Sequence, residues 1–154
     1  MSLQTLGAIT GAAVLAGGVL VATQVASDGA SAPHTLTVGE RAKTDTTVDL
    51  GEKGDSIGDQ LAFQNPVYDA RNHKRVGYDL GSCVRTKPGV AYECSWTLRV
   101  TGGSLVVEGP FLDAGDSTLA ITGGTGKYAD ASGDMRLHAL NAKGTAYRFA
   151  YRVR

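Results

Sequence analysis

The sequence predicts an all-β fold in which about eight short antiparallel strands form a small barrel or sandwich. Several segments alternate apolar and polar residues, as a strand does when one face is buried and the other faces water. Glycine accounts for 21 of the 154 residues, and no segment after residue 32 has the apolar spacing of a helix. A barrel is favoured over an open sheet because closure removes exposed strand edges.

The composition limits the partners that this domain is expected to bind. A chain of 154 residues corresponds to one domain and is long enough to bury a core. Its 15 basic and 15 acidic residues balance, and no basic patch stands out. Nucleic acid is therefore not an expected partner.

The first 32 residues are predicted to be an export segment rather than part of the barrel. Residues 1–27 carry no charged side chain, residues 6–26 are largely apolar, and Ala30-Ser31-Ala32 has the spacing of a signal-peptide cleavage site. An uncleaved membrane anchor and a buried helix are the alternatives, since about 21 apolar residues span a bilayer. A signal peptide or an anchor places the domain, residues 33–154, in a secreted or extracytoplasmic location. Membrane contact is expected only if the segment stays uncleaved.

The strands follow one another at short spacing along the rest of the chain. Pro66 must lie near the end of its strand or at a bulge, because proline has no amide hydrogen for the ladder. Gly102-Gly103 is expected to form a turn. We expect strands at 35–42, 60–68, 75–85, 91–100, 105–108, 119–122, 134–140 and 145–153, and an irregular strand at 46–50 within a long polar loop over 43–58.

Two strands show the alternation clearly enough to predict which side chains face the interior. Their apolar positions all fall on one face, and charged or hydroxyl side chains occupy the other. The predicted inward residues are Tyr147, Phe149, Tyr151 and Val153 in the last strand, and Tyr92, Cys94, Trp96, Leu98 and Val100 in the strand 91–100.

The two cysteines lie at equal distances on either side of Pro88-Gly89. Proline fixes φ at the first central position of a type II turn, and glycine accepts the positive φ of the second. A two-residue turn at this point places Cys83 directly opposite Cys94. Opposed cysteines on one sheet face are close enough for a disulfide bond, which an oxidising compartment favours. Two free thiols are the alternative.

The same hairpin register makes two further predictions. It pairs Thr86 with Ala91 next to the turn. It also places Gly81 opposite Trp96, where the missing side chain leaves room for the indole ring.

Two glycine-containing motifs are interpreted as loops rather than as catalytic elements. Gly54-Asp-Ser56-Ile-Gly58 has the G-x-S-x-G pattern of hydrolases, but it precedes a strand instead of forming a strand-to-helix turn. The segment from Gly123 to Lys127 resembles a phosphate loop, but it lacks the full spacing and a following helix. We therefore predict no nucleophilic serine, and a tight turn at 123–126.

The histidines give no sign of a metal site. His34, His73 and His138 are scattered without the spacing of metal ligands. We expect neither a metal nor a cofactor.

Residues 57–153 resemble the plant allene oxide cyclases. The segment from Leu105 reads LVVEGPFLDAGDSTLAITGGTGKYADASGDMRLHAL, and those proteins carry a similar Gly-Pro-aromatic-Leu stretch, an acidic loop and a Leu-Ala-Ile-Thr-Gly-Gly-x-Gly segment. The upstream segments GDQLAFQNPVYD and KRVGYDLGSCV match in the same order and at nearly the same spacing. Dirigent proteins share the Gly-Asp strand start and the Gly-Gly-Thr-Gly turn.

The resemblance implies an eight-stranded antiparallel barrel, often assembled as a homotrimer, with an apolar cavity. In the cyclases the cavity holds an unstable fatty-acid epoxide and steers its closure to a cyclopentenone. In dirigent proteins it steers the coupling of radicals. Such catalysis is largely conformational, because folding a flexible substrate into a reactive geometry removes entropy from the barrier.

The site residues of the cyclases transfer only in part. Asn65 matches an asparagine of the second cyclase strand, Cys83 matches the cavity cysteine, and Phe111 stands where the cyclases have a tyrosine. Glu40 can stand in for the cyclase glutamate, but the asparagine and Ser-Pro pair that help bind the epoxide oxygen have no counterpart in residues 35–50. A bridged Cys83 would also lose its thiol role. Allene oxide cyclisation itself is therefore not expected.

Two functions are consistent with this sequence. One is a secreted barrel that binds a hydrophobic small molecule and guides its cyclisation or coupling, as a cofactor-free isomerase or cyclase. The other is a non-catalytic binding or interaction module at the cell surface, in which aromatic side chains fill the barrel. A cavity of some hundreds of Å³ with a few polar groups would favour the first. Its expected lining is Asn65, Tyr92, Trp96, Phe111, Tyr147, Phe149 and Tyr151.

Overall fold

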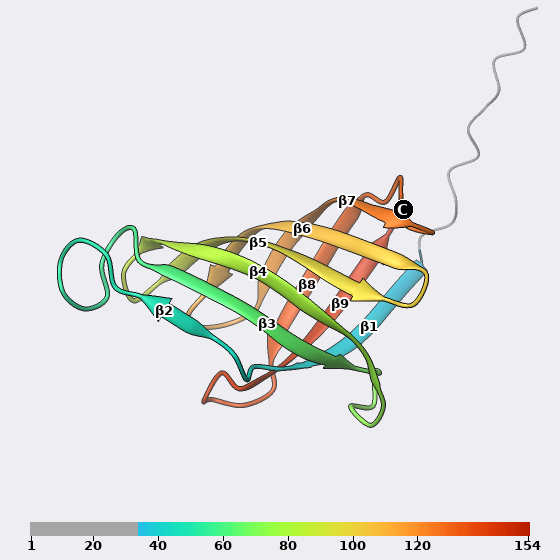
Figure 1. Ribbon diagram of the computed structural model, residues 1–154, viewed down its shortest axis with the longest axis horizontal. Helices are drawn as coiled ribbons and strands as arrows, with labels where there is room; N and C mark the ends of the chain where they lie inside the picture. The colour runs from blue at the N-terminus through green and yellow to red at the C-terminus, as the bar shows by residue number, and fades with distance from the viewer. Residues whose placement is uncertain (1–33) are drawn as a thin grey trace, which may run out of the picture.

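The computed structural model describes residues 34–154, and in this part the chain forms nine strands in one antiparallel sheet (Figure 1). Each strand from β3 onward pairs with the next one along the chain, so the sheet is built from successive hairpins. The strands are β1 (His34–Arg41), β2 (Thr46–Val48), β3 (Gln60–Tyr68), β4 (Arg75–Lys87), β5 (Ala91–Val100), β6 (Gly103–Leu112), β7 (Ser117–Gly126), β8 (Gly133–Ala139) and β9 (Ala146–Val153).

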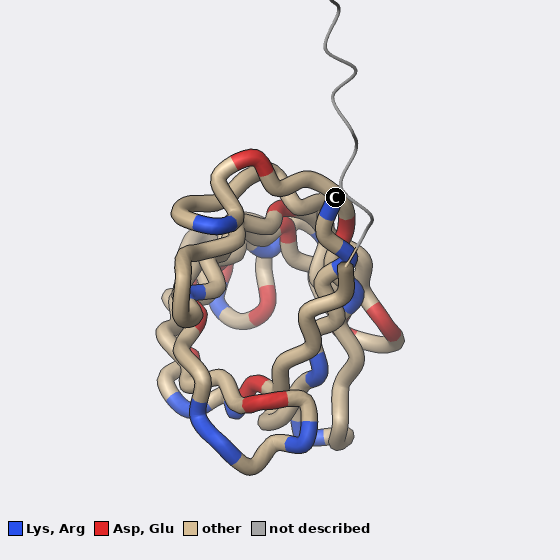
Figure 2. The backbone as a smooth tube through the Cα atoms, turned by 90° about the vertical axis from the view of Figure 1, so that its right-hand side faces the viewer, with Lys and Arg blue, Asp and Glu red and all other residues tan. Residues whose placement is uncertain are grey.

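The first strand closes the sheet into an eight-stranded barrel. Along one edge β1 pairs with β9 over its full length, and along the other edge Gly39 and Glu40 pair with Tyr68 and Val67 of β3. Figure 2 shows a closed ring of backbone with both basic and acidic residues around it. The predicted all-β barrel is confirmed.

Asn65 binds the backbone where the ladder of the barrel wall is interrupted. β1 and the short strand β2 pair with two different stretches of the same edge of β3. Between β1 and β2, at residues 42–45, the ladder is interrupted. The Asn65 side-chain oxygen accepts hydrogen bonds from the amides of Lys43 at 2.8 Å and Thr44 at 3.0 Å. A buried amide that lacked these partners would destabilise the fold.

The core lies inside the barrel and follows the predicted alternation. In β5 the side chains of Cys94, Trp96 and Leu98 are buried, and in β9 those of Phe149, Tyr151 and Val153 are buried. The side chains between them in each strand are more exposed, as expected for a barrel with one solvated face. The two predicted inward faces are therefore confirmed.

The β4–β5 hairpin carries the predicted disulfide. Cys83 pairs directly with Cys94 in the register, and the two are bridged. Gly81 lies opposite Trp96, and a side chain at this glycine would meet the Trp96 Cβ atom at 2.3 Å. Both predictions are confirmed, and the glycine is required by the close approach of the two strands.

The prediction for the residues next to this turn was wrong by one position. Thr86 falls in a bulge, and Lys87 rather than Thr86 pairs with Ala91. The turn itself has the expected form, with φ of 66° at Gly89 and the Val90 amide bonded to the Lys87 carbonyl at 3.1 Å. An extra residue beside a tight turn is a common way for a hairpin to increase its twist.

The predicted turn at 123–126 was also wrong, because these glycines extend β7. Ladder pairs join Gly123 to Val106 and Gly126 to Gly103, so the chain turns only at residues 127–130. At Gly124 a side chain would meet the Ser104 carbonyl oxygen at 2.4 Å. The glycines thus allow two strands to pack closely. In the sequence, glycines used in this way look the same as glycines in a turn.

The remaining sequence predictions concern Pro66 and the N-terminal segment. The β3–β4 register shifts just after Pro66, between Val67 and Tyr68, as a strand proline requires. The predicted export segment, residues 1–32, lies outside the described residues. Between residues 34 and 154, no helix is long and apolar enough to cross a membrane.

Candidate functional site

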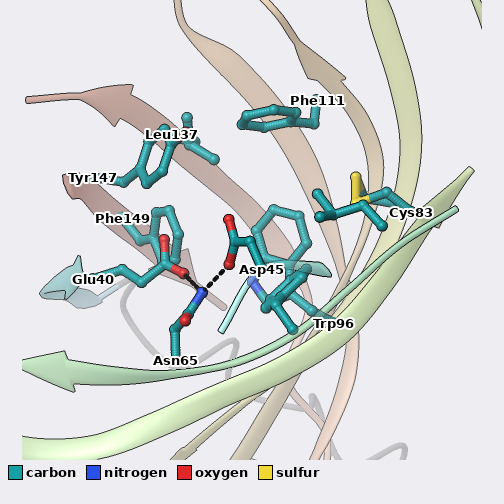
Figure 3. A pocket seen from close by; sticks show the side chains of 12 residues that line it. Glu40, Asp45, Asn65, Cys83, Trp96, Phe111, Leu137, Tyr147 and Phe149 are labelled. Atoms are coloured by element: carbon teal, nitrogen blue, oxygen red, sulfur yellow. Dashed lines mark hydrogen bonds between the residues drawn. A yellow bond between two sulfur atoms is a disulfide. The ribbon is translucent and has the colours of Figure 1, made fainter. Parts of the chain in front are cut away.

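One cavity opens inside the barrel, between β1, β3, β4, β5, β6, β8 and β9 (Figure 3). Its volume is about 80 Å³, and about 460 Å³ when the space that opens to solvent is included. The smaller volume is less than the roughly 150 Å³ that holds a benzene molecule, so a ligand would have to extend through the mouth. The lining residues are Glu40, Asp45, Leu61, Phe63, Asn65, Cys83, Cys94, Trp96, Phe111, Leu137, Tyr147 and Phe149.

Aromatic rings form much of the cavity wall. Trp96 of β5 and Phe149 of β9 have ring centroids 5.7 Å apart, and Phe111 meets Tyr147 edge to face at 6.0 Å. Phe63 adds an edge-to-face contact with Trp96 at 6.1 Å. These rings come from neighbouring inward positions of different strands, so the barrel holds them rigidly. The wall offers flat, apolar surfaces that suit a flat or unsaturated molecule.

A hydrogen-bonded acid pair lies at one side of this wall. The Asn65 side-chain nitrogen donates to Glu40 Oε1 at 2.6 Å and to Asp45 Oδ1 at 2.7 Å, as Figure 3 shows. Glu40 is only 4% exposed. Its burial raises the pKa of this carboxyl to about 7; the hydrogen bond from Asn65 acts in the opposite direction and the charge of Asp45 adds to the rise. Glu40 can therefore gain or lose a proton near neutral pH.

A second acid, Asp79 of β4, lies deeper in the barrel. It pairs with Asn65 in the β3–β4 ladder and faces the same side of β4 as Cys83. The side chain is fully buried, and neither of its oxygens meets the geometry of a hydrogen bond to any residue from 34 to 154. Burial, together with the Glu40 charge, raises the pKa of Asp79 to about 9; the backbone amides of Asn65 and Asp79 act in the opposite direction.

Two tyrosines complete the polar surroundings. Burial and the charges of Glu40 and Asp45 raise the pKa of Tyr147 to about 12. The Tyr151 hydroxyl is buried without a hydrogen-bond partner among the described residues, and burial raises its pKa well above the ordinary value. Both phenols therefore stay protonated at neutral pH and can donate a hydrogen bond.

Arg85 marks the end of the barrel beyond the disulfide. Its guanidinium lies 2.6 Å from Asp55, 2.7 Å from Asp113, and 3.6 Å from the centre of the Tyr92 ring. Asp55 also accepts a hydrogen bond from the Gly89 amide at 2.6 Å. The cluster thus ties the loop 49–59 to the β4–β5 turn and to the end of β6. It is complete without a ligand.

The structure brings most of the predicted lining residues together. Asn65, Trp96, Phe111, Tyr147 and Phe149 line the cavity. Asn65 has a structural role as well, because its side chain accepts hydrogen bonds from the backbone between β1 and β2.

Two of the predicted residues lie elsewhere. Tyr92 packs beneath Arg85 and beside Phe111 but does not line the cavity. Tyr151 is fully buried in the core below it. Their alternation placed both correctly on the interior face, but alternation does not give the height of a side chain along the barrel.

The acids were the main omission from the predicted site. Glu40 enters the predicted site only as a substitute for a cyclase residue, and Asp45 and Asp79 are absent from it. Strand parity gave a usable signal, since Glu40 lies two residues from buried Val38 and Asp79 lies four residues from buried Cys83. A carboxyl at an inward position of a strand is a candidate for a functional group.

The fold and this cavity together define a class: a closed antiparallel barrel with an interior aromatic site and buried carboxyl groups. The family model described as "Allene oxide cyclase" matches residues 25–151. The chain therefore belongs to the allene oxide cyclase family.

Solved structures of the same barrel cover several activities. A pyocyanin demethylase is 25% identical, with a TM-score of 0.67 over 79% of this chain and 100% of that chain. A pterocarpan synthase dirigent protein is 15% identical, with a TM-score of 0.61 over 79% of this chain and 91% of that one. A Diels–Alderase from Streptomyces koyangensis is 9% identical, with a TM-score of 0.59 over 81% of this chain and 71% of that one. The last two likenesses establish the shared fold alone.

Proposed function

We propose that this barrel binds a hydrophobic small molecule with a flat, unsaturated part and guides its cyclisation or coupling. The observation that carries the proposal is the pairing of aromatic walls with a buried carboxyl, Glu40, that titrates near pH 7. Relatives of this fold include a dirigent protein and a Diels–Alderase, which supports small-molecule chemistry in the barrel.

The cavity would act mainly by holding the reacting parts of the ligand together. A ligand held against the aromatic wall loses internal rotations before reaction, so less entropy is lost at the barrier. Glu40 would then donate a proton to a ligand atom as charge develops and take it back afterwards. Asn65 fixes the orientation of that carboxyl through its 2.6 Å hydrogen bond.

The reaction proposed is not allene oxide cyclisation. Phe111 lacks the hydroxyl of the matching cyclase residue, and the sulfur of Cys83 is held in a disulfide. We propose a cofactor-free reaction, because ring closure or coupling of an already reactive ligand rearranges electrons within the ligand. Among residues 34–154, no group of three or more His, Cys, Asp or Glu side chains is placed to hold a metal ion.

The disulfide between Cys83 and Cys94 indicates an oxidising, extracytoplasmic environment. We propose that residues 1–32 direct export, as a cleaved signal peptide or as an anchor. A homotrimer, which the family resemblance implies, is part of the same proposal. Sedimentation velocity of the secreted protein and sequencing of its N-terminus test both statements.

Native mass spectrometry of the protein secreted by its own host tests the function. A retained lipophilic molecule is expected, and it should be lost in Leu61→Trp, which fills the lined space. Leu80→Trp is the matched control, since Leu80 lies on the solvated face of β4 and does not line the cavity. A wild-type protein that retains no molecule and binds none from a panel of aromatic compounds would sink the proposal.

A non-catalytic interaction module is the second candidate, and one surface observation favours it. Apolar side chains are exposed around β2 and the turns beside it, including Ile57 at 72%. Val48, Leu50 and Val90 lie on the same end of the barrel. An apolar patch of this kind suits a protein partner. Loss of a partner in Ile57→Asp with unchanged ligand retention would favour this reading.

A further inference from the structure

The cavity carries acids without any base. Among the residues that line the cavity, two are carboxylic acids, Glu40 and Asp45, and none is lysine, arginine or histidine. The nearest described cation along β4, Arg85, is already held by Asp55 and Asp113. Buried carboxyl groups in proteins are normally paired with a cation or hydrogen-bonded on both oxygens.

Asp79 is a buried acid that the described residues leave without a counter-charge. It is fully buried and faces the barrel interior below Asn65, and among residues 34–154 its oxygens have only the backbone amides of Asn65 and Asp79 nearby, at poor hydrogen-bond geometry. An unpaired buried carboxyl destabilises a fold, so its presence needs a compensating interaction. The Trp96 indole nitrogen and the Tyr151 hydroxyl are buried as well, and they interact with each other without full hydrogen-bond geometry.

The walls around these acids present the faces of aromatic rings. Trp96 and Phe149 are tilted against each other at 5.7 Å, and Tyr147 stacks on Phe149 at 6.3 Å. The face of an aromatic ring attracts a cation, and tryptophan does so most strongly. Rings and carboxyl groups in one cavity therefore favour the same kind of ligand charge.

We propose that the cavity is a site for an aromatic ligand that carries a positively charged nitrogen, with Glu40 in the cavity wall supplying the opposite charge, Asp79 adding to that charge from behind Asn65, and the aromatic wall packing against the ring system. This inference rests on the proposed small-molecule function and names the class of ligand. It is independent of whether the ligand then cyclises, couples or is simply held.

Binding of such a cation is linked to release of protons. The groups that face Glu40 are Asp45, Asp79, Tyr147 and Tyr151, all of them acids or phenols. Without ligand, burial and mutual repulsion keep a proton on Asp79 at neutral pH and leave Glu40 partly protonated. A bound cation favours the ionised carboxyl groups, so cation affinity rises with pH.

Three probes of one size and shape test the charge preference on the full chain. They are N-methylquinolinium, which is a cation, 1-methylnaphthalene, which is neutral, and 1-naphthoate, which is an anion. Isothermal titration calorimetry gives each affinity at pH 5.5, 7 and 8.5. Trp96 is the one tryptophan of the chain, so quenching of its fluorescence by the cation places binding in the cavity.

The cation is expected to bind at least about tenfold more tightly than the neutral probe at pH 8.5, and the anion most weakly. Its affinity should fall toward pH 5.5, while that of the neutral probe stays constant. Equal affinities for cation and neutral probe would overturn the inference and leave the proposed function intact. Binding of none of the three would overturn the inference together with the proposal of an aromatic ligand site.

Two isosteric variants connect the preference to the named acids. Glu40→Gln and Asp79→Asn should each reduce the cation preference about tenfold and weaken its pH dependence, without weakening the neutral probe. Glu93→Gln, at an exposed acid of β5, should change neither. Thermal unfolding verifies that each variant folds, and either acid variant is sufficient for the test. A cation preference that persists in a folded acid variant would overturn the inference.

Discussion

The barrel interior contains two buried charge clusters that differ in one respect. At one end Arg85 contacts the carboxylates of Asp55 and Asp113 and stacks on Tyr92, so opposite charges balance within the protein. Around the cavity, Glu40 and Asp79 share an amide neighbour, Asn65, but no cation. Both clusters are on the inner face of β4, with Cys83 between them.

The difference separates structural from functional use of buried charge. The Arg85 cluster holds the loop 49–59 and the β6 end against the β4–β5 turn, and nothing further is needed to stabilise it. The acids at the cavity are stable only as protonated groups or with a partner from outside. At a cluster that lacks a cation within the fold, a ligand can supply the missing positive charge.

Removing the cation from the complete cluster is expected to have the largest effect. Arg85→Ala leaves two carboxylates facing each other and removes the packing on Tyr92, so the free energy of unfolding should fall by about 3 kcal/mol. Urea denaturation at pH 7 measures it, with Arg148→Ala on the exposed face of β9 as the control. A change below about 0.5 kcal/mol would mean that the cluster is not structural.

Removing the disulfide should lower the free energy of unfolding slightly less than Arg85→Ala does. It should affect both clusters, because Cys83 lies between them on β4. Replacing Cys83 and Cys94 by serine removes a link across 11 residues, and the expected loss of stability is about 2–3 kcal/mol. Chemical denaturation of the double variant measures the loss. A thiol assay on the unreduced wild-type protein should find no reactive thiol among the two cysteines, and finding two would refute the bridge.

The acid cluster should make stability depend on pH. The folded-state pKa of Asp79 is about 9, above its ordinary value of 3.8, so the folded protein holds a proton that the unfolded chain has released. Stability is therefore greatest below that ordinary value and falls as the pH rises toward about 9. Glu40 acts in the same direction up to about pH 7.

Asp79→Asn should remove most of this dependence. Relative to wild type, the variant should become progressively more stable as the pH rises from 5 to 9, since its amide cannot ionise. Urea denaturation at both pH values measures the gain. Parallel pH profiles for variant and wild type would show that Asp79 is already compensated within the protein, and the contrast between the two clusters would disappear.

The smallest expected effect is at the rim of the complete cluster. Asp113→Asn keeps a hydrogen-bond acceptor for Arg85 but removes one charge, and Asp55 remains 2.6 Å away. We expect a loss of about 1 kcal/mol, because Asp113 is partly open to solvent. Differential scanning calorimetry of the variant checks this value, and a loss as large as that of Arg85→Ala would show that the two carboxylates do not share the guanidinium.

The sequence was most informative where a local pattern fixes the geometry. Pro88-Gly89 and the two cysteines fixed the hairpin register, and alternation identified the inner faces of β5 and β9. The same kind of evidence failed at Thr86, where one bulged residue shifts the pairing, and at Gly123–Gly126, where close strand packing requires glycines that resemble a turn.

The acid site was harder to predict because it depends on contacts between distant strands. Asn65 and Asp79 are paired in the β3–β4 hairpin, and only barrel closure brings Glu40 of β1 to them. Acidic residues are normally exposed, so each of them alone indicates a solvated face. Only the combination of inward parity, burial and a missing cation distinguishes them, and burial is a property of the folded chain.

The pairing of the first strand with the last has a consequence for how the protein is made. Neighbours from β3 to β9 are joined by short hairpins, and such local contacts form quickly. β1 must wait, because its partner β9 is the last of the described strands along the chain. Until then the edge of β8 is unprotected, and β1 pairs with β3 only through Gly39 and Glu40. The chain is therefore most prone to aggregation before β9 is in place, and loss of β9 alone would leave every other hairpin able to form around an open barrel.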